Sequence, residues 1–319
     1  MPQKDLRVVL AVVFIVLASF FAGYKWFLIV REHNLARSIL DNCAFDQDKI
    51  ICLQNAITDK IRKDPKATSE IFSGLLWLIQ SGQLKVDARI FSDLAHEAGM
   101  EIIAGGADLE QALDWCGTDF KQACMHGAVM TYIDINDAEP VTSEKFAFCG
   151  QFRSWSDIHD IKYLNCLHAL GHEIIAQKIQ PLNEALDTCS VLGSPADSAC
   201  ASGVLMEYSK GESGQSSHSE SPTGTILLPC DEVAERWQPL CYAGAGSYRQ
   251  YYPDKESWDN TLNYCDSASI INKSNCIIGA VDRLFLAAAY DYKTAELMCG
   301  QLTADHKKYC LDALFKNYR

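Results

Sequence analysis

The longest apolar run in the chain lies near its N-terminus, from Val8 to Val30. A single charged residue, Lys25, interrupts the run, with Tyr24 and Trp26 on either side of it. A membrane-spanning helix needs about 20 apolar residues, and tyrosine and tryptophan collect at membrane–water interfaces. The run therefore predicts a transmembrane signal anchor over residues 8–31, preceded by a short cytoplasmic tail of residues 1–7. A cleaved signal peptide is the alternative, although the run is long for one.

Beyond residue 31 the apolar positions follow the period of a helix and not the alternation of a strand. Residues 68–80 show this clearly, since Ile71, Leu75 and Ile79 fall on one helical face. Further helices are predicted over residues 123–132, 164–178, 199–208, 238–251, 275–289 and 307–317. The pattern indicates an all-α domain over residues 32–319. Residues 210–224 are rich in serine and glycine and are predicted to form a flexible inserted loop.

The 14 cysteines divide into close pairs that recur along this domain. Each pair is predicted to join the end of one helix to the start of the next by a local disulfide. No C-x-x-C motif occurs, which disfavours zinc ribbons and redox dithiols. Because disulfides persist in oxidising compartments, the domain is expected to be periplasmic, extracellular or lumenal. The pairs are Cys43 and Cys52, Cys116 and Cys124, Cys149 and Cys166, Cys189 and Cys200, Cys230 and Cys241, Cys265 and Cys276, and Cys299 and Cys310.

These pairs belong to a longer repeat. Four of the seven pairs begin with a leucine, an aspartate or asparagine, any residue and then the cysteine, and these motifs recur after 73, 73 and 76 residues. One further unit lacks its cysteines: residues 93–104 match residues 165–176 at six of twelve positions. Internal periods of this length are typical of stacked helical hairpins. The sequence thus predicts a solenoid of about eight hairpins with seven local disulfides.

Two motifs accompany the cysteine pairs: A-x-x-x-C, as in Ala112 to Cys116, and C-x-x-G, as in Cys200 to Gly203. In these motifs residues 35–319 loosely resemble the disulfide-rich Sel1-like repeats, relatives of the tetratricopeptide repeats. The resemblance implies a right-handed superhelix of helical hairpins with a concave binding face. It implies no catalytic residues.

The charge of the chain restricts its partners. The net charge is −13, and residues 1–31 hold four basic residues against one acidic residue, so the remaining domain is more acidic than the whole chain. Such a surface repels nucleic acid and anionic lipid headgroups. Nucleic acid is therefore excluded as a partner, and contact with the membrane is expected through the N-terminal anchor alone.

Histidines recur at one position of the repeat, two residues after the second cysteine of a pair or after its equivalent, Leu94. Residues four apart on a helix share a face. Each histidine therefore shares its helical face with the residue four positions later, which is a methionine in two units and a histidine in the third. We call these side chains the histidine row. Stacked repeats would align these side chains. Imidazoles with thioethers suit copper(I), and imidazoles with Glu97, Glu101 or Glu173 suit zinc. The candidate ligands are His96, Met100, His126, Met130, His168, His172 and Glu173. Packing of the histidines between helices is the competing interpretation.

No established catalytic motif is present. The H-E-x-x-H motif of metalloproteases fails, because His96-Glu97 is followed by Met100 and His172-Glu173 by Ala176. No catalytic residue is therefore assigned. The leading hypothesis is a membrane-tethered binding or scaffold protein that presents its helical repeats to a protein or peptide partner. The alternative is a copper- or zinc-binding protein, or a metal-dependent hydrolase, built on the histidine row.

Overall fold

The computed structural model describes residues 30–43, 48–86, 88–116, 121–136, 146–152, 160–176, 181–211, 229–248, 255–288 and 292–318. Regular structure within these residues is entirely helical, which confirms the predicted all-α class for them. None of their helices is long and apolar enough to cross a membrane. Residues 8–29 of the predicted anchor, and residues 212–224 of the predicted loop, lie outside the described residues.

The chain divides after Lys85 into two compact units. The first contains a helix over residues 30–42, α2 (Lys49–Lys63), the 3-10 turn η1 (Pro65–Ala67) and α3 (Thr68–Gln80). The boundaries of α3 coincide with the predicted helix. The unit packs on fully buried apolar residues of α2 and α3, among them Ile57, Ile61 and Ile71. Gly74 leaves no room for a side chain, because a Cβ atom there would collide with the carbonyl oxygen of Glu32.

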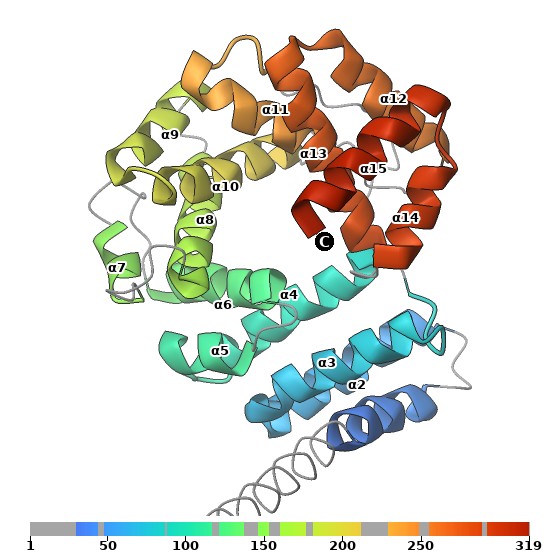
Figure 1. Ribbon diagram of the computed structural model, residues 1–319. Helices are drawn as coiled ribbons and strands as arrows, with labels where there is room; N and C mark the ends of the chain where they lie inside the picture. Colours follow the sequence, from blue (N-terminus) through green and yellow to red (C-terminus); the bar gives the residue numbers. More distant parts are fainter. Residues whose placement is uncertain are drawn as a thin grey trace, which may run out of the picture. The chain divides into compact units, whose positions relative to one another are not determined.

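In the second unit, from Val86 onward, each short helix is followed by a longer one. Figure 1 shows the short helices on the outer side of the row and the long helices on its inner side. The long helices are α4 (Ala88–Ala104), α6 (Lys121–Asn136), α8 (Ile161–Ala176), α10 (Ala196–Gly211), α11 (Gln238–Tyr248), α13 (Ile270–Ala287) and α15 (Ala304–Tyr318). The short ones are α5 (Leu109–Cys116), α7 (Phe146–Gly150), α9 (Leu182–Cys189), α12 (Lys255–Ser267) and α14 (Tyr292–Gly300).

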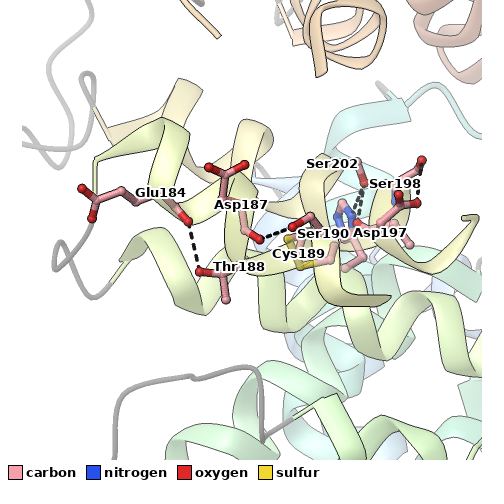
Figure 2. Close-up of a disulfide and its surroundings, with 11 residues drawn as sticks. Glu184, Asp187, Thr188, Cys189, Ser190, Asp197, Ser198 and Ser202 are labelled. Carbon is pink, nitrogen blue, oxygen red and sulfur yellow. Dashed lines mark hydrogen bonds between the residues drawn. A yellow bond between two sulfur atoms is a disulfide. The ribbon is translucent and has the colours of Figure 1, made fainter. Parts of the chain in front are cut away.

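All seven predicted cysteine pairs form disulfides, and each spans between 8 and 17 residues of sequence. Figure 2 shows the region of Cys189, at the end of α9, where Ser190 donates a hydrogen bond to the carbonyl oxygen of Asp187 at 2.6 Å. The disulfide between Cys189 and Cys200 ties α9 to α10, the two helices of one hairpin. Loops of about 15 residues give roughly 3 kcal/mol in the chain-entropy account. The disulfides therefore stabilise each hairpin locally.

Glycines set the closest helix contacts of the second unit. A Cβ on Gly99 would collide with the carbonyl oxygen of Cys124, and one on Gly127 with that of His96, so α4 and α6 meet backbone to backbone. The same reciprocal contact joins α8 to α10 and α11 to α13, and the glycines that make it are Gly171, Gly203, Gly246 and Gly279. Six of the seven long helices thus pack as three equivalent glycine-contact pairs, and α15 is the exception.

The aspartate of the repeated leucine–aspartate motif makes ion pairs with a later hairpin. Asp114 pairs with Lys162, and Asp187 pairs with Arg236 at 2.7 Å. The partners are 48 and 49 residues apart in the sequence. Three of these four side chains are half exposed or more, and exposed pairs contribute about 0–1 kcal/mol. They help to register one hairpin on the next without dominating stability.

The glycine contacts predict a large cost for a single added methyl group. In Gly279→Ala the new Cβ would collide with the carbonyl oxygen of Ala243, so α11 and α13 must separate. Overpacking of this kind costs about 1–3 kcal/mol, which outweighs the gain in helix propensity. We expect a lower midpoint in thermal unfolding followed by circular dichroism. Gly300→Ala is the matched control, since nothing lies within 4 Å of its Cβ position, and an equal loss there would contradict this account.

Candidate metal centre

Three of the predicted ligands converge. The side chains of His126 on α6 and of His168 and His172 on α8 each offer a nitrogen, and these atoms all lie within 4.8 Å of one another. The ring of His96, on α4, lies edge-on to that of His126 with centroids 5.1 Å apart. His96 and Glu173 are outside the group of three. Met100 is 40% exposed, and Met130 is half-buried.

The glycine contacts place these histidines. Gly127 directly follows His126, and its close approach is to the backbone of His96 on α4. Gly203 on α10 makes the same approach to the backbone of His168. Side chains next to such contacts have short distances to span, so the ring of His126 lies beside that of His96, and His168 reaches Ser202.

The third glycine-contact pair tests whether the histidines are needed for packing. Between α11 and α13 the equivalent repeat positions carry Ala243 and Ile278. The same backbone contact forms there, from Gly279 to the carbonyl oxygen of Ala243. Helix packing therefore does not require histidine at this position, which weakens the purely structural interpretation.

Two residues of α10 form hydrogen bonds with the Nδ1 atoms of the two α8 histidines. His172 Nδ1 lies 2.8 Å from Glu207 Oε2, and His168 Nδ1 lies 2.7 Å from Ser202 Oγ. A carboxylate can only accept, so Nδ1 of His172 carries the proton of that bond. Ser202 donates its hydroxyl hydrogen to the carbonyl oxygen of Ala199 at 2.9 Å, so its oxygen accepts from His168 Nδ1. Both rings are thereby fixed with hydrogen on Nδ1.

This assignment leaves both Nε2 atoms as acceptors. They lie 3.1 Å apart, and a neutral imidazole with hydrogen on Nδ1 has a lone pair on Nε2. Two lone pairs at that separation repel each other unless a proton or a metal ion lies between them. The side chain of His172 is fully buried, so bulk water does not screen that repulsion. A proton shared between the two Nε2 atoms, or a metal ion bound to both, would satisfy them.

Glu207 contacts His172, and a second glutamate, Glu173, follows His172 in the sequence. Glu173 is 8% exposed, and its pKa is raised to about 7 by burial and, to a smaller extent, by the nearby charges of Asp134 and Glu207. A metal ion at the histidines would relieve this repulsion between like charges.

The distance between the two α8 imidazoles suits a transition metal. In a tetrahedral site with metal–nitrogen bonds of about 2.0–2.1 Å, two ligand nitrogens are about 3.3 Å apart. The 3.1 Å between His168 Nε2 and His172 Nε2 is close to that value. Glu207 and Ser202 then occupy the outer positions that orient histidine ligands in metal sites. The sequence did not identify these two residues as part of the site, although Ser202 stands at the repeat position that carries histidine in three other units.

Comparison of the chain with protein families, curated proteins and solved structures gives no significant match. The resemblance to Sel1-like repeats consequently stays a prediction from the cysteine motifs.

The hydrogen-bond assignment can be checked directly. In protein prepared without metal, we expect hydrogen on Nδ1 of both His168 and His172, since Ser202 and Glu207 accept from these atoms. Long-range ¹H–¹⁵N correlation spectra of histidine-labelled protein distinguish the two tautomers. An Nδ1 without hydrogen on either ring would show that the lone pairs of the two Nε2 atoms do not face each other. That result would remove the argument for a cation.

Proposed function

We propose that this protein binds one transition-metal ion, zinc or copper, through His126, His168 and His172. The observation that carries the proposal is the pair of α8 imidazoles whose Nδ1 atoms are held by α10 and whose Nε2 atoms face each other at 3.1 Å. The nitrogen of His126 completes a group of three donors.

The donor set narrows the choice of metal. Every cysteine lies in a disulfide, so thiolate ligands are absent. Neutral imidazoles favour zinc and copper over magnesium and calcium, which prefer oxygen ligands. His96, whose ring lies beside that of His126, supplies a fourth imidazole in this proposal after a side-chain rotation. If it does not bind, three protein ligands leave one position open, as in catalytic zinc sites, and a metal-dependent hydrolase is then the catalytic form of the proposal.

The proposal includes a location and an architecture. Seven local disulfides support an oxidising compartment, and the apolar run over residues 8–31 supports a single N-terminal anchor. The repeated hairpins, with their equivalent glycine contacts, support a solenoid in which the metal site lies within the stacked helices.

Presentation of a protein or peptide partner is the second candidate function. It is supported by apolar side chains exposed at the C-terminal hairpins, where Ile270 is 90% exposed, Ile271 73% and Leu297 63%. Monomeric proteins bury most such side chains, and grouped exposure marks interaction surfaces. This function and metal binding are compatible, because they use different helices.

Metal binding is tested by elemental mass spectrometry of the purified full-length chain after dialysis against zinc or copper(II). We expect about one equivalent of metal per chain. The variant with His126, His168 and His172 all changed to alanine should hold none while it keeps its helical circular dichroism. Glu207→Gln should bind about 10–100-fold more weakly, because loss of an outer hydrogen-bond partner typically costs that much.

A buried histidine elsewhere supplies the control. His306, on α15, contacts Asp266 at 3.1 Å and lies far along the chain from the three histidines, so His306→Ala should retain full metal content. A wild-type chain that is folded and holds no metal would contradict the proposal and favour the scaffold function.

A further inference from the structure

The links between helices in the second unit are of two kinds. Disulfides join neighbouring helices within one hairpin, as Cys189–Cys200 joins α9 to α10. Reciprocal glycine contacts join the long helices of two consecutive hairpins, as in α8 and α10. Neither kind joins α6 to α8, α10 to α11 or α13 to α15, although the helices of each of these three junctions touch.

The histidine cluster lies across the junction of α6 with α8. His126 belongs to α6, and its ring centroid is 4.3 Å from that of His172 and 5.4 Å from that of His168, both on α8. A weak hydrogen bond also joins these two helices, from Asn165 Nδ2 to Met125 Sδ at 3.8 Å. On α8, His168 and His172 are also hydrogen-bonded to α10, through Ser202 and Glu207 respectively.

The next junction offers a comparison within the same molecule. α10 contacts α11 between the second and third glycine-contact pairs, and there the repeat position carries Ser202 and Ala243. No metal-ligating group of three occurs there among the described residues. Among the described residues, a histidine group of this kind therefore occurs at one of the three junctions that have no glycine contact.

We propose that the bound metal fastens α6 to α8, so that metal occupancy controls how readily this one junction opens. The inference rests on the proposed metal binding and adds its consequence. Separation of the two helices pulls His126 away from His168 and His172, so the open junction cannot keep all three ligands. Metal that binds the closed form more tightly than the open form reduces the open population by at most the factor 1 + [metal]/Kd, about 100-fold when the metal is at 100 times its Kd, and by less to the extent that His168 and His172 hold metal in the open form.

Hydrogen–deuterium exchange of the full-length chain, read by mass spectrometry with zinc chloride or with EDTA, measures this opening. We expect zinc to slow exchange in peptides of α6 and α8, by up to about 100-fold at 100 times the Kd. Peptides of α12, α13 and the first unit should exchange alike in both conditions, because they lie outside the junction. Equal slowing throughout the chain would overturn the proposal, since the metal would then stabilise the whole fold and not one junction.

His126→Gln separates the junction from the site itself. His168 and His172 stand four residues apart on α8 and still form a two-ligand site, so this variant should bind zinc more weakly than the parent. At saturating zinc its α6 peptides should exchange as fast as with EDTA, while α8 peptides remain partly protected. His306→Gln is the matched control and should behave as the wild type in both helices.

The outcomes separate the two claims. Zinc bound at one equivalent with unchanged exchange in α6 and α8 overturns the fastening of the junction and leaves metal binding standing. Failure of the wild type to bind zinc or copper overturns both. Slowing of α6 by zinc in a folded His126→Gln variant would also contradict the proposal, because the α6 ligand would then be unnecessary.

Discussion

The backbone contact between glycines is the constraint on which the second unit depends. At Gly127, Gly203 and Gly279 a carbonyl oxygen of the facing helix occupies the space of a side chain. Helices that approach this closely fix their register, since sliding by one residue would place a side chain in the contact. The contact also determines which side chains meet beside it, and in two of the three pairs these include histidines.

The histidine cluster is costly unless it binds a cation. Buried polar groups need partners, and the Nδ1 atoms of His168 and His172 have theirs in Ser202 and Glu207. Those partners force the two Nε2 lone pairs toward each other, which gives the site a requirement for positive charge. The third glycine-contact pair reaches the same packing with alanine and isoleucine. Helix packing alone therefore does not require histidine at these positions of α6 and α8.

The sequence predicted the local structure well because its signals were local. Cysteine spacing determined the disulfides, and apolar periodicity located α3 to the residue. Helix ends were less predictable: α10 begins at Ala196 and ends at Gly211, whereas residues 199–208 were predicted, because a terminal turn adds little apolar pattern. The repeat aligned the histidines, but it could not show that Glu207 reaches His172 from another helix. That contact depends on how closely α8 and α10 pack, which a spacing in the sequence does not encode.

The most direct test of the central claim is the X-ray absorption spectrum of the metal-loaded protein at the metal edge. The account predicts a first shell that contains at least three nitrogens at about 2.0–2.1 Å, with the outer-shell scattering of imidazole rings. Loss of one imidazole in His126→Gln would identify the ligand from α6. A shell of oxygens alone, or a spectrum unchanged in that variant, would contradict a metal centre built on these three histidines.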